Sequence, residues 1–392
     1  MRPNPRRAVV LGLVLTGLPA LLGAQDQDRT GPVHRSQHHA FVVDTVVDGL
    51  DHPWGLAFLP AGDPAGDILV TERPGRLRIV HLEGDTGRLD PTPVSGVPEV
   101  WANGQGGLLD VVLHPSFGEN RWVYLSYSKP GGSGRATTAV VRGRLEGGGL
   151  VDVEEVLEAE AWRRSRVHFG SRMVFDADGY LYVTIGERGE SDAAQDRSNH
   201  QGVTLRLHDD GSVPADNPFV DDPRVRPEIW TWGNRSPQGL AVHPETGELW
   251  QTEHGPRGGD ELNVLRAGAN YGWPAITYGI NYNGTVITED TARAGMEQPV
   301  IYWDPSIATS GLEIYDGALF PAWRGDAFVG GLAGRLLARV DLLDPSGSEV
   351  NGWEPLLPDY GRIRQVRQAA DGALWLLLDE DPAALVRLVP AG

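Results

Sequence analysis

The stretch Trp54-Gly55-Leu56-Ala57-Phe58, followed after a turn by Asp67-Ile68-Leu69-Val70-Thr71, decides the fold because the same unit recurs along the chain. In each copy an apolar strand and a turn precede a second strand rich in β-branched and aromatic residues. The paired segments of the other copies are 107–112 with 122–125, 171–175 with 181–185, 238–242 with 249–252, 311–315 with 327–331, and 363–367 with 373–377. The sequence therefore contains six copies of one supersecondary unit.

The spacing of the copies decides between two all-β architectures. They begin about 50 to 70 residues apart, which suits four-stranded blades with inserted loops. Six small sheets around an axis cover one another and leave only short edges. A β-sandwich is the alternative, but it does not explain the recurrence of one unit over nearly the whole chain. We therefore predict an all-β fold, a six-bladed β-propeller over residues 41–392.

Residues 1–24 have the pattern of a secretory signal peptide. Three arginines within the first seven residues precede an apolar run over 8–22, and Leu22-Gly23-Ala24 offers small residues for cleavage. A membrane anchor needs about 20 apolar residues, more than this run supplies. We expect a periplasmic or secreted protein without a stable membrane span in its mature form, and a flexible segment over 25–40. The choice between general secretory and twin-arginine export stays open.

The charge of the chain excludes one class of partner. Removing three arginines and no acidic residue takes the formal charge from −19 to −22. Nucleic acid is not an expected partner, because phosphate binding needs a basic face. The carboxylates can instead serve a hard cation such as calcium. The absence of cysteine excludes disulfides and thiolate metal sites.

Most histidines have an ordinary explanation. His114 and His243 each precede a proline at the turn after the first strand of a copy, which indicates turn residues. His34, His38 and His39 lie in the segment expected to be flexible, where a metal site is not favoured.

His168 breaks this pattern. It lies in Val167-His168-Phe169-Gly170, immediately before the third copy and at the mouth of a blade. A neutral imidazole there can take a proton from a substrate hydroxyl. Taken alone, a histidine at the start of a strand is more often structural than catalytic.

Other blade entrances carry polar residues too. Gln105 stands among glycines before the second copy, Arg235 precedes the fourth, and Arg362 and Arg364 open the sixth. In a propeller such entrances converge on the central channel, so residues far apart in sequence meet there. Several cations at one point favour an anionic ligand.

The densest polar segment runs over 253–263 and continues at 270–274. Its carboxylates, together with carbonyls exposed by Gly and Pro, can supply the six to eight oxygens that calcium takes. A salt-bridged surface loop is the alternative. The chain has no dinucleotide-binding Gly-x-Gly-x-x-Gly after a strand, no Walker loop and no Gly-x-Ser-x-Gly elbow.

Taken together, these motifs make the sequence similar to the soluble quinoprotein sugar dehydrogenases of the glucose/sorbosone dehydrogenase family, and within it to the bacterial aldose sugar dehydrogenases. The resemblance runs from about Leu50 to Arg387. It is carried by the segments 51–56, 104–108, 168–172, 235–239, 253–256, 260–263 and 270–274.

The resemblance implies a pyrroloquinoline quinone (PQQ) in the axial pocket with a calcium ion on it, and oxidation of an aldose at C1 to a lactone. His168 matches the general base, and Arg235 the residue that polarises the quinone oxygen. The remaining matches are cofactor contacts at Gln105, Ser236, Tyr282, Arg362 and Arg364, calcium ligands at Gly255, Pro256, Asp260, Glu261 and Tyr271, and a substrate contact at Trp303. The electron acceptor would be an unidentified periplasmic partner.

Two positions depart from the family pattern. Ser236 stands where some members have asparagine, and Ala333 stands where the glucose-specific branch has a lysine. Loss of that lysine predicts weaker PQQ binding unless Arg335 reaches the cofactor.

Two other functions remain open from the sequence. A calcium-dependent lactonase would use the same cation and histidine without a quinone, and would hydrolyse esters without a cofactor. A non-catalytic propeller that binds a partner is the third possibility. Neither the preferred sugar nor the oligomeric state follows from the sequence.

Overall fold

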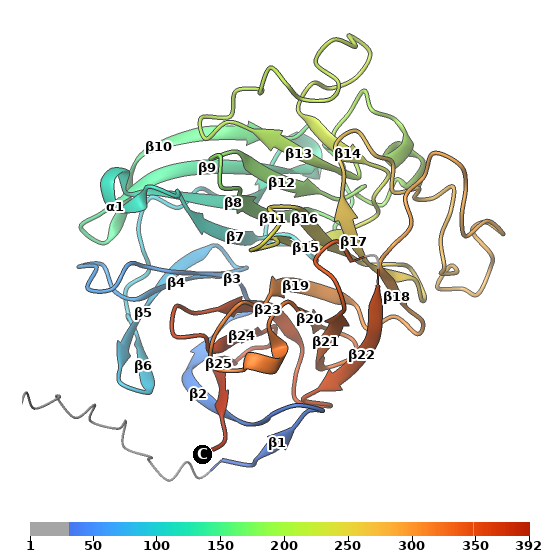
Figure 1. The fold of residues 1–392 in the computed structure, drawn as a ribbon. Helices are drawn as coiled ribbons and strands as arrows, with labels where there is room; N and C mark the ends of the chain where they lie inside the picture. Colours follow the sequence, from blue (N-terminus) through green and yellow to red (C-terminus); the bar gives the residue numbers. More distant parts are fainter. Residues whose placement is uncertain (1–30, 348) are drawn as a thin grey trace, which may run out of the picture. The chain divides into compact units, whose positions relative to one another are not determined.

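The computed structural model describes residues 31–347 and 349–392, and the chain from 31 to 391 forms six small antiparallel sheets arranged as blades (Figure 1). The predicted signal peptide over 1–24 and the first part of the segment 25–40 lie outside the described residues.

Five blades follow the chain in order, each with its first strand innermost. Blade 1 comprises β3 (Pro53–Phe58), β4 (Ile68–Glu72), β5 (Arg76–Glu83) and β6 (Thr86–Leu89). Blade 2 comprises β7 (Leu108–Leu113), β8 (Trp122–Pro130), β9 (Ala136–Glu146) and β10 (Gly149–Glu158). Blade 3 comprises β11 (Gly170–Phe175), β12 (Leu181–Ile185), β13 (Val203–Leu207) and β14 (Ile229–Trp232). Blade 4 comprises β15 (Pro237–Val242), β16 (Leu249–Glu253), β17 (Asp260–Leu265) and β18 (Ile301–Trp303). Blade 5 comprises β19 (Thr309–Ile314), β20 (Ala327–Gly331), β21 (Leu336–Leu342) and β22 (Val350–Leu356).

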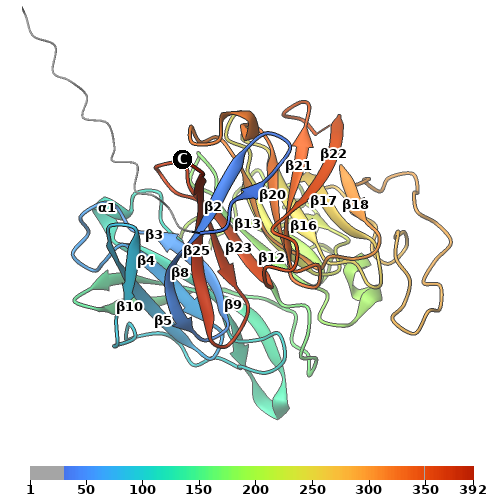
Figure 2. The same ribbon diagram turned by 90° about the horizontal axis from the view of Figure 1, so that it is seen from below.

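Blade 6 joins the two ends of the described chain. It comprises β23 (Ile363–Gln368), β24 (Leu374–Leu378), β25 (Ala383–Pro390), β2 (Ala40–Leu50) and β1 (His34–Arg35). β2 pairs antiparallel with β25, with Phe41 opposite Pro390 and Asp44 opposite Arg387. Figure 2 shows these two strands, blue and red, side by side.

The innermost strands close a ring. Each of β3, β7, β11, β15 and β19 contacts the innermost strand of the next blade, and β23 contacts β3. The predicted six-bladed β-propeller is therefore confirmed. The innermost strands begin within two residues of the predicted copies, because each copy is an apolar run that both of its neighbours bury.

Helical structure is confined to short loop segments in the described residues. They are α1 (Phe117–Asn120) and the 3₁₀ turns η1 (Gly132–Gly134), η2 (Ser191–Gln195) and η3 (Pro321–Trp323). Among the described residues, no helix is long and apolar enough to span a membrane.

The apolar core lies between neighbouring blades. Leu69 and Leu77 of blade 1 pack with Val111 and Leu125 of blade 2, and similar clusters occupy the other blade interfaces. Side chains of a strand alternate between its two faces, so each blade offers one apolar face to each neighbour. The axis itself remains for polar residues.

The described part of the predicted flexible segment, residues 31–40, differs from that prediction. β1 pairs with β2, the backbone N–H of Gln37 donates to a Glu354 carboxylate oxygen at 3.0 Å, and the His39 ring packs against Trp323 at 5.2 Å. Residues of blade 5 thus hold this segment against the propeller. The polar composition of the segment itself does not indicate these contacts.

Candidate active site

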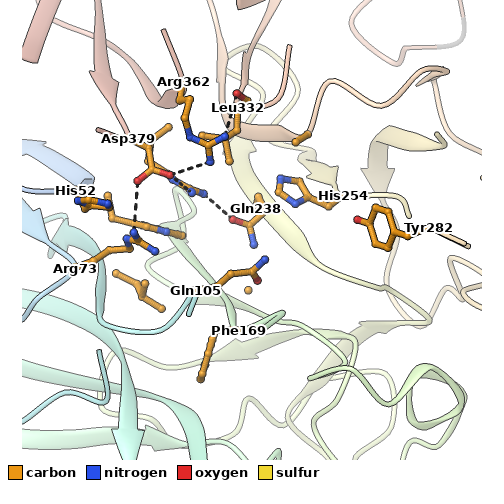
Figure 3. Close-up of a pocket in the computed structure, with 15 residues that line it drawn as sticks. His52, Arg73, Gln105, Phe169, Gln238, His254, Tyr282, Leu332, Arg362 and Asp379 are labelled. Carbon is orange, nitrogen blue, oxygen red and sulfur yellow. Dashed lines mark hydrogen bonds and ion pairs between the residues drawn. The ribbon is translucent and has the colours of Figure 1, made fainter. Parts of the chain in front are cut away.

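A polar pocket of about 350 Å³ opens on the propeller axis (Figure 3). Every blade contributes to its wall, through its innermost strand, the loop before that strand or the loop after its second strand. The side chains that matter below are His52, Arg73, Gln105, Phe169, Gln238, His254, Tyr282, Arg362, Arg364 and Asp379. Of the predicted blade-entrance residues, Gln105, Arg362 and Arg364 line this cavity, whereas His168 and Arg235 do not. Tyr282, predicted from the family resemblance, lines it from the segment between β17 and β18.

Three arginines gather around one carboxylate in this pocket. Asp379 lies 2.9 Å from Arg364, 3.3 Å from Arg362 and 3.8 Å from Arg73, measured between carboxylate oxygens and guanidinium nitrogens. Although burial alone would raise it, these arginines lower the pKa of Asp379 to about 2. The group keeps a surplus of positive charge, which an anionic ligand would compensate.

His168 stands beside this pocket, immediately before β11 and the lining residue Phe169. Its backbone has φ = 55°, a left-handed conformation that is uncommon outside glycine. Its carbonyl oxygen lies so close to Gly186 that no Cβ would fit there. Strained backbone of this kind is typical of functional sites.

The ring of His168 is held by a buried carboxylate. Its Nδ1 lies 2.5 Å from Glu187 Oε2, and Glu187 follows β12 in the same blade. If Nδ1–H donates to Glu187, Nε2 carries the lone pair. Burial lowers the pKa of His168, an effect that Glu187 opposes and Arg235 and Arg188 reinforce. The ring is thus a neutral base with a fixed orientation.

Gln105 connects His168 to the second blade entrance. Its Oε1 accepts a hydrogen bond from the backbone N–H of His168 at 2.7 Å, and its own N–H donates to the Arg166 carbonyl at 2.8 Å. The amide NH₂ of Gln105 is left to face the pocket. The predicted cofactor residue therefore also positions the predicted base.

Arg235 is 5 % exposed and lines the small cavity described below instead of the axial pocket. Its backbone N–H donates to the Glu253 carboxylate, and its Nη1 donates to the carbonyls of Gly255 at 2.8 Å and His254 at 3.1 Å. The Gly255 carbonyl, predicted as a calcium ligand, therefore faces a guanidinium cation here. Pro256 is buried next to it.

A second, much smaller cavity of about 10 Å³ lies on the other side of Arg235. It is lined by Glu253, Glu261, Gly255, Tyr271 and Thr277, among others, and it has room for about one water-sized particle. Burial raises the pKa of both Glu253 and Glu261, and Glu253 further raises that of Glu261 by repulsion. Two buried carboxylates beside so small a space suit a single oxygen-liganded cation.

The side chains of two predicted calcium ligands, Asp260 and Tyr271, already form other hydrogen bonds. The Asp260 carboxylate accepts from the Gly255 N–H at 2.9 Å, the Ser306 hydroxyl at 2.8 Å and the Thr309 N–H at 3.2 Å, so it organises the loop. The Tyr271 hydroxyl donates to the Val264 carbonyl at 2.6 Å, which leaves its backbone carbonyl as a ligand for the small cavity.

Ser236 is fully buried, and its hydroxyl accepts from Gln238 Nε2 at 3.2 Å. It lies behind the wall of the axial pocket, which Gln238 lines instead.

Trp303 is not brought to the axial pocket. It is 2 % exposed and packs in the apolar cluster between blades 4 and 5, 6.1 Å from the Trp353 ring. Tyr282 is the aromatic residue at the pocket mouth: it is 72 % exposed, and its ring lies 6.0 Å from the Arg235 guanidinium.

Three residues at or beside the axial pocket escaped the sequence reasoning: Arg73, Glu187 and Asp379. Glu253 and His254 entered it only as members of the polar segment 253–263. All five residues stand at or within two residues past the end of a blade's second strand. A search of second-strand ends, parallel to the search of first-strand entrances, would have found them.

A six-bladed propeller with a cation-lined axial pocket, and a histidine–carboxylate pair beside it, defines the class of ligand-binding propeller enzymes. The family model for glucose/sorbosone dehydrogenase matches residues 50–387. The chain belongs to this glucose/sorbosone dehydrogenase family.

Relatives of known name agree with this assignment. The chain is 45 % identical over 353 residues to the aldose sugar dehydrogenase YliI of Escherichia coli (strain K12), covering 89 % of this chain and 92 % of that protein. The apo-form crystal structure of the Escherichia coli soluble aldose sugar dehydrogenase superimposes with a TM-score of 0.83 at 43 % identity, over 90 % of this chain and 100 % of that one. The PQQ-bound aldose sugar dehydrogenase of Streptomyces coelicolor gives a TM-score of 0.73 at 28 % identity, over 89 % and 98 % of the chains. The homologues thus support an oxidoreductase that acts on sugars.

Proposed function

We propose that this protein is a PQQ- and calcium-dependent aldose dehydrogenase that oxidises the C1 hydroxyl of a cyclic aldose to a lactone. The observation that carries the proposal is the buried His168–Glu187 pair beside an arginine-lined axial pocket. Relatives named aldose sugar dehydrogenases, one of them PQQ-bound, support it.

The charge of the axial pocket fits this cofactor. PQQ carries three carboxylic acid groups, which are ionised at neutral pH. Within the described part of the chain, Arg73, Arg362 and Arg364 share Asp379 as their one carboxylate partner. Guanidinium groups bind carboxylates through two parallel hydrogen bonds, so these residues would hold the carboxylates of the cofactor.

His168 supplies the proton chemistry. Its Nε2 would take the proton of the C1 hydroxyl while the C1 hydrogen leaves with its electron pair, so the sugar is oxidised and the C1–O bond becomes a carbonyl. Glu187 keeps the ring oriented and stabilises the imidazolium that forms. Gln105 fixes the backbone of the base.

Bound PQQ would supply the acceptor of the hydride, and calcium a Lewis acid beside it. Arg235 is buried, and its guanidinium lies 6.0 Å from the ring of Tyr282 at the pocket mouth, so it would stabilise negative charge that develops nearby. Arg362 donates a hydrogen bond to the Leu332 carbonyl at 3.3 Å, in the loop that also contains Ala333. Arg335 pairs with Glu380 at 3.4 Å and is not among the residues that line the axial pocket.

The small cavity is the better candidate for a calcium ion in the described residues. Glu253 and Glu261 supply carboxylates, and Tyr271 and Thr277 supply carbonyls. The carbonyls of Gly255 and Pro256 would contact a second calcium only after Arg235 releases Gly255. Calcium would thus stabilise the blade 4 loop and assist the cofactor.

The test is reconstitution of the mature protein. Apo-protein mixed with PQQ and calcium should show the absorption of bound quinone, and a pulse of aldose without an electron acceptor should convert it to the quinol spectrum. An artificial dye should then be reduced in a sugar-dependent way. Binding of PQQ without any sugar-driven reduction across a broad aldose panel would contradict the proposed reaction.

Two controls separate the other functions. Ester or lactone hydrolysis by the protein without PQQ would indicate a hydrolase. A binding module is indicated by two results together. Neither the wild-type protein nor His168→Ala would oxidise sugar, and His168→Ala would bind its ligand as well as the wild type does.

A further inference from the structure

Arg188 is a fully buried arginine beside the segment that carries the proposed base. It follows Glu187 in the loop after β12. Its Nη1 donates to the carbonyl of Val167, and its Nη2 donates to the carbonyls of Ser165 at 2.9 Å and Ala136 at 3.4 Å. None of the ion pairs in the described residues involves Arg188, so backbone carbonyls take the place of a carboxylate partner. A buried cation without a counter-ion is unusual and costly, which indicates a specific role.

The same guanidinium holds the backbone on both sides of His168. The Val167 carbonyl that it binds belongs to the peptide group whose N–H donates to Gln105 Oε1 at 2.7 Å. Both polar atoms of that peptide group are therefore fixed. On the other side of the base, the guanidinium lies 3.4 Å from the centre of the Phe169 ring, which is a cation–π contact. One side chain thus holds the residue before His168 and the residue after it.

His168 needs such support because its backbone is strained. A left-handed φ of 55° is unfavourable for a residue with a Cβ and persists only where surrounding contacts enforce it. In this conformation the ring reaches Glu187, whose Oε2 lies 2.5 Å from Nδ1 and also accepts from the Gly189 N–H at 2.8 Å. The loop after β12 therefore holds the ring through Glu187 and the backbone through Arg188.

We propose that Arg188 is a positioning residue for the base, which holds the strained segment 167–169 so that the His168 ring stays on Glu187 with Nε2 free for the sugar. This inference rests on the proposed function, because that function gives His168 the proton transfer. A general base works only when its lone pair is aimed at the proton that it takes, and a misplacement of about 1 Å can cost about 100-fold in rate.

The charge of Arg188 has a second consequence for the base. Glu187 favours a protonated ring, which could not take a proton. Burial lowers the pKa of His168, and Arg235 and Arg188 add to this effect against Glu187. Burial also lowers the pKa of Arg188 itself to about 9, so its guanidinium is still charged at neutral pH. His254 interacts with the ring too, but burial holds its own pKa well below the ordinary value, so it is neutral there. Arg188 therefore lets Glu187 orient the ring without protonating it.

The first readout needs no cofactor. The imidazole nitrogens of apo-protein are isotope-labelled for NMR, and the signal of His168 among the 11 histidines is the one lost in His168→Gln. In wild type at neutral pH, the ring should carry its proton on Nδ1. In Arg188→Met, which removes the charge and the donors, the ring should lose this fixed tautomer and become protonated at a higher pH. Arg188→Lys keeps the charge, so its ring should become protonated close to the wild-type pH.

The second readout is the kinetics of the protein loaded with PQQ and calcium. Arg188→Met should lower kcat for aldose oxidation by about 10- to 100-fold, because the base is misplaced, while KM for the sugar changes little. The rate should also fall at a higher pH on the acid side of its pH profile, since the base must be neutral. Arg188→Lys should keep the wild-type pH profile and recover only part of kcat, because an ammonium group lacks the planar fork of a guanidinium.

Arg206→Met is the matched control. Arg206 is also buried and stacked on an aromatic ring, 3.7 Å from the centre of Tyr180, but it lies on β13 and its guanidinium pairs with Asp216. This variant removes a comparable contact from the same blade, so it should cost stability and leave the titration of His168 and the pH profile unchanged. Melting temperatures of the apo-proteins check that each variant is folded.

The outcomes distinguish this inference from the proposed function. If the His168 signal behaves as expected but wild type oxidises no aldose, the proposed function fails, whereas the orientation of the ring by Arg188 stands. If wild type oxidises aldoses and Arg188→Met matches Arg206→Met in kcat and in the titration of His168, the role of Arg188 is refuted. A wild-type ring that carries its proton on Nε2 at neutral pH refutes that role as well, whether or not the variants fold.

Discussion

The two cavities beside Arg235 have opposite charge. The axial pocket collects the arginines 73, 362 and 364 around one carboxylate, whereas the small cavity collects two glutamates, Glu253 and Glu261, beside one arginine, Arg235. The formal charge of −19 for the whole chain predicts neither. The comparison teaches that the local balance of charge, and not the net charge, indicates which ligand each cavity takes.

The two cavities also differ in what neighbouring groups do to ionisation. In the pocket, arginines outweigh the effect of burial and lower the pKa of Asp379 to about 2. In the small cavity, burial raises the pKa of Glu253 and Glu261, and repulsion from Glu253 adds to the shift of Glu261. The first site has more arginines than carboxylates, whereas the second has one arginine, Arg235, for two carboxylates.

The largest effect should come from removing the base beside the pocket. His168→Gln should lower kcat for aldose oxidation by about 10²- to 10⁴-fold, the usual contribution of a general base. PQQ affinity should change little, because the arginines remain. Steady-state kinetics and a PQQ titration would measure the two quantities. His114→Gln, at a turn far from the pocket, is the control, and a His168→Gln enzyme with near wild-type kcat would contradict the assignment.

A charge change in the small cavity should separate metal binding from cofactor binding. Calcium at about 100 times its Kd should stabilise wild-type protein by about 2.7 kcal/mol, and Glu261→Gln should lose most of this gain. Thermal unfolding with calcium or with a chelator would show it. The exposed Glu289→Gln serves as the control. An equal stabilisation by calcium in Glu261→Gln and in wild type would show that the ion binds elsewhere.

The stability of the apo-protein should depend on pH because the two glutamates of the small cavity are only partly compensated in charge. A carboxyl whose pKa is raised on folding favours the folded state below its ordinary value of 4.5, and this advantage is lost as the pH rises through the folded value. In chelator, the unfolding free energy should therefore fall from about pH 5 toward neutrality and above. Glu261→Gln should flatten this slope, and calcium should do the same in wild type. Denaturant titrations at several pH values would measure this slope. An unchanged slope in Glu261→Gln and in calcium-loaded wild type would disprove the link between the raised pKa and stability.

The smallest effect should come from a single arginine of the pocket. Arg73→Gln should weaken PQQ binding by about 10-fold, because a charge-assisted hydrogen bond contributes about 1.5–3 kcal/mol and Arg362 and Arg364 remain. The loss should shrink at high salt. Arg324→Gln, exposed outside the pocket, is the matched control. Unchanged affinity in Arg73→Gln would limit the cofactor contacts to blade 6.

The fold could be predicted from the sequence because each repeat contains a recognisable apolar strand. The six first strands lie within two residues of their predicted starts, and their entrances do converge on one pocket. The entrance residues Gln105, Arg362 and Arg364 were predictable for the same reason. What could not be predicted is which side chain each loop turns inward.

The misses have physical causes. Trp303 lies on β18, where alternation turns its ring into the apolar gap between blades, so a position near the site in sequence is not near it in space. Asp260 has the composition of a calcium ligand, but nearby backbone and hydroxyl donors saturate it. Glu187 is the converse case, because only the chain fold beyond β12 brings it to His168.

The pairing of β2 with β25 has a consequence for how the protein is made. β2 precedes the first blade along the chain, and its partner β25 follows the fifth. The blade that carries Arg362, Arg364 and Asp379 therefore cannot be completed until the strands of the other five blades have been synthesised. The axial pocket is thus a property of the closed ring and is absent from a partly synthesised propeller.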